Sequence, residues 1–369
     1  MSILKPNYND SIVNVSNSIL KRFNVKNYHS TIKELDTILL NHKKVVLILL
    51  DGMGANIINH HLQDNDFLKK NMFKTITSVF PPTTVAATNS VLRAKVPYET
   101  GYVGWVQYFE QEDIHNIVFM NRDFYNDKKI VPNDLTEQYL KQPDIFDLLK
   151  EINPEMSINK IFPSFIEEGF ETFDEQLVHL KTITDKNETS FSYVYWVEPD
   201  LTEHVQGIKS EQTKNMLRSL NNSLTNYAKS LDDDTVVVVI ADHGLTDVEE
   251  INLMDFKDIT STLKRLPSIE PRATAFDIKN GLEGEFKDAF NKHFSGKYQL
   301  FTKSEFKESG LIGIGKKHPY LDSFLGDYMA LAIDKYMFKL NDHKTYKSHH
   351  AGLLKDEMEV PLVIYTKKQ

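Results

Sequence analysis

The chain has 369 residues, more than one hydrophobic core usually holds, so we expect either one large α/β domain with a sizeable insertion or two domains. Its net charge of −9 is spread along the sequence without a basic stripe, which argues against docking to nucleic acid. The absence of cysteine excludes disulfides, thiolate metal sites and a cysteine nucleophile, so Asp, Glu, His or hydroxyl groups must hold any metal.

The beginning of the chain, MSILKPNYNDSIVN, lacks the basic and apolar regions of a signal peptide, and no apolar run reaches the length of a membrane span. We therefore expect a cytoplasmic protein without a membrane partner. The sequence leaves the oligomeric state open.

Four apolar segments are predicted to form strands. Short β-branched runs bounded by turn residues are typical of strands that are buried on both faces of a parallel sheet. Three of the segments end in an acidic residue, which is Asp51, Asp200 or Asp242. In chain order the segments are KKVVLILLDGMG at 43–54, SFSYVYWVEPD at 190–200, TVVVVIADHGLTD at 235–247 and VPLVIYT at 360–366.

Segments with a helical pattern separate these strands, and the longest lies at 207–234. Alternating strands and helices predict an α/β fold with a largely parallel central sheet and helices on both faces. Such sheets bind ligands at the carboxyl ends of their strands, so we expect Asp51, Asp200 and Asp242 to converge at one edge. The apolar residues of 207–234, spaced near the 3.6-residue helical period, are Met216, Leu217, Leu220, Leu224, Tyr227 and Leu231.

Residues 252–345 show a different pattern. Their segments PRATAFDI, EGEFKDAFNKHF, KYQLFTKSEF and GDYMALAIDKYMF predict a strand, a helix and two further strands. We therefore expect a single domain, 1–369, into which residues 252–345 are inserted as an α+β cap or side subdomain.

Pairs of Asp and His residues follow two of the predicted strands. Asp200 and His204 are four residues apart, so a helical turn directs both side chains to one point, although such a pair also serves as a local hydrogen bond or a helix cap. Asp242 and His243 follow the most apolar strand, where an unpaired buried carboxylate demands a nearby cation. The alternative there is a turn that Asp242 caps.

Two further residues complete a candidate metal site. Asp51 precedes Gly52 and is either a ligand or part of a strand-end Asp-Gly turn, and His350 is either a ligand or a satisfied loop histidine. Three Asp and three His suit two borderline-soft divalent ions, for which zinc is the expected metal, while Mn²⁺ and iron accept the same ligands. The six candidates are Asp51, Asp200, His204, Asp242, His243 and His350.

A candidate nucleophile lies in SVFPPTTVAATNSVL at 78–92. The two prolines stop the preceding strand, and Thr83 and Thr84 are then placed to open a helix whose N-terminal N–H groups favour an anion such as phosphate. The alternative is that these threonines only cap the helix.

Five segments together resemble the alkaline phosphatase superfamily, and most of all its type I phosphodiesterase/nucleotide pyrophosphatase branch. They are LLDGMG, FPPTT, YWVEPDLTEH, IADHGL and HHAGL. They occur in the family's order and rough spacing and span residues 43–365. One such motif is weak, whereas five in order are highly specific.

The resemblance implies a phosphoric ester hydrolase, most similar to a phosphodiesterase or nucleotide pyrophosphatase, that works through a phosphothreonine intermediate at a two-zinc site. Matched to the family pattern, Thr84 is the nucleophile and Thr83 the runner-up. His350 is preferred over His349 because the family's histidine directly precedes small residues. The pattern assigns Asp51, Asp242 and His243 to one zinc, which also contacts Thr84, and Asp200, His204 and His350 to the other.

The substrate implied by the resemblance is a small phosphate ester, with a nucleotide as one candidate. The diesterase branch often carries an Asn that contacts a phosphoryl oxygen, whereas this chain has Thr100 and Trp105 near that place. Asn89 is either the substitute for that contact or a residue that only stabilises its helix. Arg272 is either a contact to the substrate phosphate or part of a surface ion pair. A phosphonate or phosphomonoester hydrolase on the same scaffold and a non-catalytic binding or signalling relative are the alternatives to a diesterase.

Overall fold

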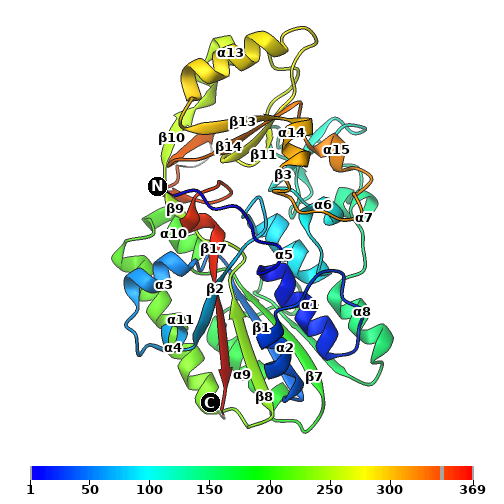
Figure 1. The fold of residues 1–369 in the computed structure, drawn as a ribbon, viewed down its shortest axis with the longest axis vertical. Helices are drawn as coiled ribbons and strands as arrows, with labels where there is room; N and C mark the ends of the chain where they lie inside the picture. Colours follow the sequence, from blue (N-terminus) through cyan, green and yellow to red (C-terminus); the bar gives the residue numbers. More distant parts are fainter. Residues whose placement is uncertain (1, 341–344, 368–369) are drawn as a thin grey trace.

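The computed structural model describes residues 2–340 and 345–367. It has a larger lobe built on a central sheet and a smaller lobe built on a second sheet, with the N-terminal segment running between them (Figure 1). The predicted insertion at 252–345 includes residues 341–344, which lie outside the described residues.

The central sheet has the strand order β2-β17-β8-β1-β7-β6. The four strands from β8 to β6 are parallel to one another, and β17 runs antiparallel to both of its neighbours. Strands β1 and β8 are completely buried, as their apolar sequences predict. The strands are β1 (Lys44–Leu50), β2 (Met72–Thr77), β6 (Ser157–Ile161), β7 (Ser190–Trp196), β8 (Thr235–Ile240) and β17 (Glu359–Thr366).

Helices cover this sheet in two groups, one on each side (Figure 1). The predicted apolar stripe of 207–234 lies on α11, where every predicted position but Met216 is buried and Leu231 follows the helix end. One group consists of α1 (Ile12–Arg22), α2 (Lys33–Leu40), α5 (Thr84–Arg93) and α8 (Ile145–Ile152), and the other of α3 (Ala55–His61), α4 (Phe67–Lys70), α9 (Phe173–Thr184) and α11 (Glu211–Lys229).

The second sheet is antiparallel and has the order β13-β14-β12-β11-β3-β4-β5. Two separate segments of chain build it, so the smaller lobe contains residues 106–123 in addition to part of 252–345, and the predicted domain division stays a prediction. Helix α13 (Glu283–Phe294) buries three phenylalanines in this lobe. The strands are β3 (Val106–Phe109), β4 (Ile114–Ile117), β5 (Arg122–Asp123), β11 (Ser268–Ile269), β12 (Ala273–Phe276), β13 (Tyr298–Thr302) and β14 (Tyr328–Ala332).

Short elements connect the two lobes. Strand β9 (Thr246–Asp247) pairs with β16 (Ser348–His349), and β10 (Glu249–Asn252) pairs with β15 (Tyr336–Lys339). The remaining helices are α6 (Pro97–Thr100), α7 (Leu135–Tyr139), α10 (Asp200–Gln206), η1 (Leu253–Asp255), α12 (Lys257–Thr260), α14 (Lys303–Glu308), α15 (Leu321–Phe324) and α16 (Lys355–Met358).

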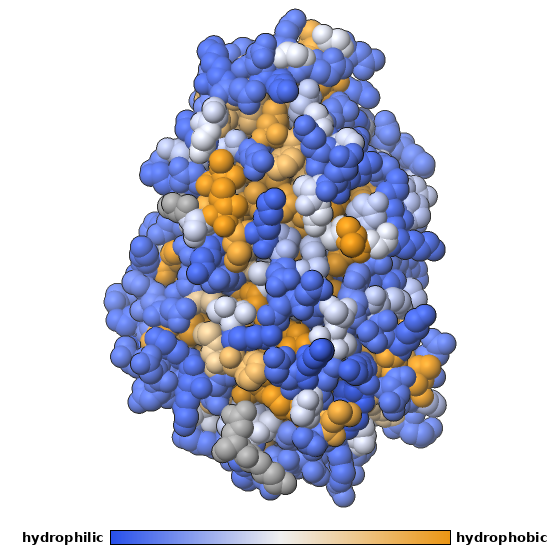
Figure 2. Space-filling model, viewed as in Figure 1, coloured by the Kyte–Doolittle hydropathy of each residue, from blue (hydrophilic) through white to orange (hydrophobic). Residues whose placement is uncertain are grey.

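The face of the molecule seen in Figure 2 is mainly hydrophilic, and its apolar side chains gather most in the upper half. No helix in the described part of the chain combines the length and the apolar character that crossing a bilayer requires.

Candidate metal centre

The parallel register of the central sheet brings three acidic residues to one edge. Leu49 of β1 pairs with Ile240 of β8 and with Tyr195 of β7, so these strands end at the same height. Backbone hydrogen bonds then tie the loops that follow: Asp200 N donates to Asp51 O over 3.0 Å, and Gly52 N donates to Asp242 Oδ1 over 3.1 Å. The predicted convergence of the three carboxylates follows from this register.

Thr84 lies against the group formed by Asp51, Asp242 and His243. The Thr84 hydroxyl oxygen is 3.2 Å from His243 Nε2 and 3.5 Å from Asp51 Oδ1. His243 Nε2 is also 3.4 Å from Asp51 Oδ1 and 3.5 Å from Asp242 Oδ2. Asp51, Asp242 and His243 are buried, whereas Thr84 keeps partial exposure to solvent.

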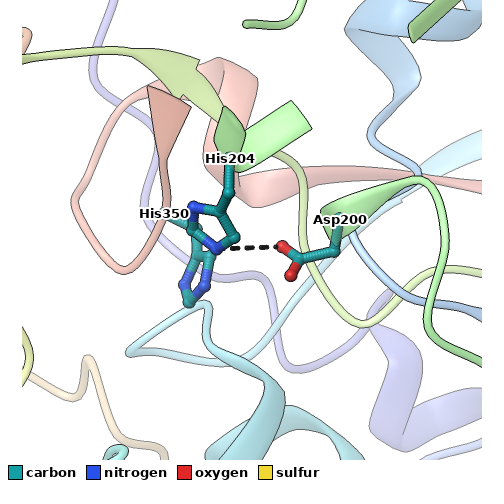
Figure 3. A group of neighbouring side chains, drawn as sticks. All are labelled: Asp200, His204 and His350. Carbon is teal, nitrogen blue, oxygen red and sulfur yellow. Dashed lines mark ion pairs between the residues drawn. The ribbon is translucent and has the colours of Figure 1, made fainter. Parts of the chain in front are cut away.

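Asp200, His204 and His350 form the second group (Figure 3). Asp200 opens the short helix α10, and the helical turn places its Oδ1 3.3 Å from His204 Nε2. His204 Nδ1 lies 2.8 Å from the carbonyl oxygen of Ser348, so Nδ1 carries the proton and Nε2 is left with its lone pair facing Asp200. The ring of His350 stacks on His243 with centroids 3.9 Å apart, which joins the two groups.

The carboxylate oxygens and imidazole nitrogens of these residues are suitable ligands for divalent cations. Asp242 Oδ2, Asp200 Oδ1 and His350 Nδ1 are buried and have no hydrogen-bond partner among the described residues. Such atoms are costly to bury unless a cation or a proton satisfies them. Potential ligand atoms of Asp200, His204 and His350 lie within 4.8 Å of one another, as do those of Asp51, Asp200 and His243. Asp200 thus lies within reach of both groups, and its assignment to one ion stays a prediction.

The pKa values of the clustered side chains are shifted mainly by burial. Burial, followed by the charges of Asp242 and Asp200, raises the pKa of the Asp51 carboxyl well above its usual range. Burial, followed by the charge of Glu198, raises the pKa of Asp200 to about 8, and burial also raises the pKa of Asp242. Burial lowers the pKa of His243, which stays neutral and able to bind a metal.

The two threonines of FPPTT have different environments. Thr83 is the N-cap residue of α5, but its side chain does not cap the helix; its hydroxyl donates instead to Glu270 Oε1 over 2.6 Å. Thr83 is completely buried and Thr84 is the threonine that faces Asp51 and His243. The choice of Thr84 over Thr83 as the nucleophile stays a prediction.

His349 is buried beside the cluster. Its Nδ1 accepts the backbone N–H of His350 over 2.9 Å, and its ring contacts that of His204 with centroids 4.8 Å apart. His349 belongs to β16, whereas His350 begins the loop that crosses the site. The structure therefore directs His350, and not His349, into the group with Asp200 and His204.

Two sequence-based candidates for substrate contact, and Thr100 near the expected place of the family's Asn, make other contacts. Asn89 donates to Val85 O and accepts from Arg93, so its amide is satisfied within α5. Thr100 is completely buried, and its hydroxyl accepts the backbone N–H of Tyr102. Neither interpretation of Arg272 was right: it is neither a surface ion pair nor free for substrate, because it is fully buried against Glu357.

Two other residues make hydrogen bonds to the cluster, although no sequence motif points to them. The Tyr195 hydroxyl donates to Asp51 Oδ2, which leaves Oδ1 as the oxygen that faces His243. The Ser78 hydroxyl donates to the carbonyl oxygen of Asp242. Both partners lie more than a hundred residues away in the chain, so only the fold reveals these contacts.

The comparisons with known proteins agree with this geometry. The model of the type I phosphodiesterase/nucleotide pyrophosphatase family matches residues 45–352. Comparison with curated proteins gives no match. The chain is similar in structure to murine ectonucleotide pyrophosphatase/phosphodiesterase 5, with 17% sequence identity and a TM-score of 0.65 over 86% of this chain and 87% of that chain.

Two further solved structures show the same similarity of fold. An inactive threonine-to-alanine variant of the murine protein in complex with AMP has 16% identity and a TM-score of 0.65, again over 86% of this chain and 87% of that chain. The human ectonucleotide pyrophosphatase/phosphodiesterase 5 has 15% identity and a TM-score of 0.64 over 87% of each chain.

The chain therefore belongs to the type I phosphodiesterase/nucleotide pyrophosphatase family. The predicted α/β fold with its largely parallel central sheet is confirmed as well.

Proposed function

We propose that this protein is a zinc-dependent phosphodiesterase of the nucleotide pyrophosphatase type that works through a phosphothreonine at Thr84. The observation that carries the proposal is the position of the Thr84 hydroxyl, 3.2 Å from His243 Nε2 and 3.5 Å from Asp51 Oδ1, beside the second group of ligands. The family match supports it, and so do the buried carboxylate oxygens and imidazole nitrogen that have no hydrogen-bond partner among the described residues.

Two divalent ions, with zinc as the expected metal, complete the site. Asp51, Asp242, His243 and Thr84 would hold one, and Asp200, His204 and His350 the other. When bound, they supply positive charge that neutralises the buried carboxylates, lowers the pKa of a coordinated hydroxyl and stabilises the charge that develops on the phosphoryl oxygens.

The residues of the chain then have distinct tasks. Thr84, deprotonated, forms the bond to phosphorus while the bond to the leaving oxygen breaks, and water later cleaves the phosphothreonine. The Thr83 side chain makes no capping hydrogen bond, so the N-terminal N–H groups of α5 remain available to bind the phosphoryl oxygens. Neutral His243 and His350, whose pKa values are lowered mainly by burial, keep their lone pairs available.

The proposed substrate is a small phosphodiester, with a nucleotide as the first class to test. A related structure holds AMP, which supports a nucleotide but at 16% identity shows only a shared fold.

The test compares initial rates on bis-p-nitrophenyl phosphate and p-nitrophenyl phosphate in one buffer, before and after chelation and after zinc is added back. We expect faster cleavage of the diester, loss of both activities with the chelator and recovery with zinc. A preference for the monoester would favour the phosphomonoesterase alternative. Metal binding without either activity would favour a phosphonate substrate or a non-catalytic relative.

A further inference from the structure

A turn of the second sheet reaches both sides of the metal centre. It consists of residues 270–272, between β11 and β12. We propose that this turn is a positioning element: Arg272, acting through Glu357, holds the loop of His350, and Glu270, acting through Thr83, holds the first turn of the helix that carries Thr84. This inference rests on the proposed function of those two residues.

Arg272 and Glu357 form a fully buried ion pair, which we call the Arg272 arm. The guanidinium binds Glu357 through two parallel hydrogen bonds of 2.7 Å, from Nε to Oε1 and from Nη2 to Oε2, and both side chains are completely buried. Its Nη1 donates to the carbonyl oxygens of Asp334 and Tyr336 over 3.0 and 2.6 Å. Arg272 is thereby fixed to the second lobe, with a geometry that Lys cannot reproduce.

Glu357 in turn binds the backbone of the loop that follows His350. Its Oε1 accepts the backbone N–H of Gly352 over 2.7 Å, and its Oε2 accepts that of Leu354 over 3.0 Å. Its carbonyl oxygen accepts the N–H of Gly244 over 2.9 Å, directly after His243. One residue therefore contacts the loops of two histidines whose rings stack on each other.

The loop after His350 packs closely against the ion pair. A Cβ atom at Gly352 would lie 2.8 Å from both Arg272 Nη2 and Glu357 Oε2, so the loop approaches the ion pair as closely as glycine permits. Leu353 N also donates to Ala332 O of β14 over 2.9 Å. The loop is thus held along its backbone two to four residues after His350.

Glu270 and Thr83, which we call the Glu270 arm, lie on the side of the site that carries Thr84. Its Oε1 accepts two hydrogen bonds, from the Thr83 hydroxyl over 2.6 Å and from Trp105 N over 2.7 Å. Glu270 is buried, and it draws the Thr83 side chain away from the start of α5, where that hydroxyl otherwise caps the helix. The arm therefore fixes the residue before Thr84 and keeps the N-terminal N–H groups uncapped.

The first test measures zinc affinity in the full-length protein by titration against a chromophoric chelator. Arg272→Lys removes the two parallel bonds, and we expect one of the two zinc ions to bind about tenfold to a hundredfold more weakly, as for other supporting residues of metal sites. The matched control is Arg265→Lys. Arg265 also pairs with a carboxylate, that of Asp277, over 3.0 Å in the same lobe, and neither residue contacts the metal loops.

A double variant guards against a folding defect. Arg272→Met with Glu357→Met removes both buried charges together, which proteins tolerate better than the loss of one partner. The Gly352 and Leu354 N–H groups then lose their acceptor, so we expect the same weakening of one zinc ion in a protein with the wild-type circular dichroism spectrum. Wild-type zinc affinity in this folded double variant would overturn the Arg272 arm.

The second test separates the two arms by kinetics. Glu270→Leu removes the acceptor of Thr83, and we expect kcat on the diester to fall about tenfold or more, with KM and zinc affinity unchanged. Glu270→Gln keeps an acceptor oxygen and should restore most of kcat. A wild-type kcat in Glu270→Leu, or equal defects in both variants, would contradict the Glu270 arm. If the wild-type protein itself binds no zinc, the proposed function fails, whereas zinc binding that is insensitive to the variants overturns this inference alone.

Discussion

Asp242 is the residue whose environment most clearly favours a bound proton or metal ion. Its side chain is completely inaccessible to solvent, and Oδ2 has no hydrogen-bond partner within the described residues. Its other oxygen accepts two backbone N–H groups, from Gly52 and His243. Leaving such a carboxylate unpaired costs several kcal/mol, so the surrounding strand is stable only with a proton or a metal there.

Replacing Asp242 by Asn tests this role. The side chain keeps its shape but loses its charge, so we expect the bound zinc to fall from about two ions per chain to about one. Elemental analysis of the dialysed protein measures it. Full occupancy in Asp242→Asn would show that this carboxylate is not a ligand.

Thr84→Ala tests the nucleophile. The methyl group cannot attack phosphorus, so we expect kcat on the diester to fall by more than about a thousandfold while zinc content stays near the wild-type value. Thr83→Ala, which removes the neighbouring hydroxyl, should cost far less. The assignment is wrong if Thr83→Ala inactivates the enzyme and Thr84→Ala does not.

At the scale of elements, local patterns predict the parts of the fold that are buried uniformly. Strands β1, β7 and β8 and helix α11 have continuous or 3.6-periodic apolar patterns, and each forms where the sequence predicts it. The edge strands β2 and β6 mix exposed and buried positions and escape such patterns. The antiparallel direction of β17 depends on the path of the preceding chain, which no local pattern encodes.

The apolar stripe of α11 gives a stability prediction. Leu217 is completely buried, so Leu217→Ala should lower the free energy of unfolding by about 2–5 kcal/mol through lost packing and a cavity. Ser219, two residues on, is exposed, and Ser219→Ala should change it by less than about 0.5 kcal/mol. Urea denaturation measures both. Equal effects would mean that α11 does not pack as described.

The site, like the fold, has parts that the sequence predicts and parts that it does not. All seven predicted residues come together: five follow β1, β7 and β8, whose ends the parallel register aligns, while Thr84 arrives at the start of α5 and His350 on a loop. The seven are Asp51, Thr84, Asp200, His204, Asp242, His243 and His350. The supporting contacts of Tyr195 and Arg272 join positions 144 and 85 residues apart. The first depends on the pairing of β7 with β1 and the second on the packing of the two lobes, and sequence spacing reveals neither.

For the whole molecule, the buried carboxylates predict an unusual pH dependence of the metal-free protein. Burial raises the pKa of Asp200 to about 8, and the pKa values of Asp51 and Asp242 are raised in the same direction. The folded protein therefore retains protons that the unfolded chain has lost. Above about pH 7.5 the histidines are almost fully neutral in both states, so buried carboxylates decide the trend; the pKa of Glu203 and that of Glu270, which is about 7, are raised by burial in the same direction.

We therefore expect the free energy of unfolding of the chelator-treated protein to decrease as the pH rises from about 7.5 to about 8.5, by at most about 1.4 kcal/mol per pH unit for each such group. Zinc replaces the protons and should reverse the trend, since metal binds better when its ligands are deprotonated. Urea unfolding at several pH values measures both. Metal-free stability that rises with pH in this range would contradict the buried, protonated carboxylates.

The most direct test of the central claim is an anomalous difference map from crystals grown with zinc, recorded at the zinc absorption edge. The account predicts two peaks about 3.5–4 Å apart, one contacted by Asp51, Asp242 and His243 and the other by Asp200, His204 and His350, with ligand distances of about 2.0–2.2 Å. A single peak, or peaks that leave Asp242 or His350 unligated, would contradict the two-metal site.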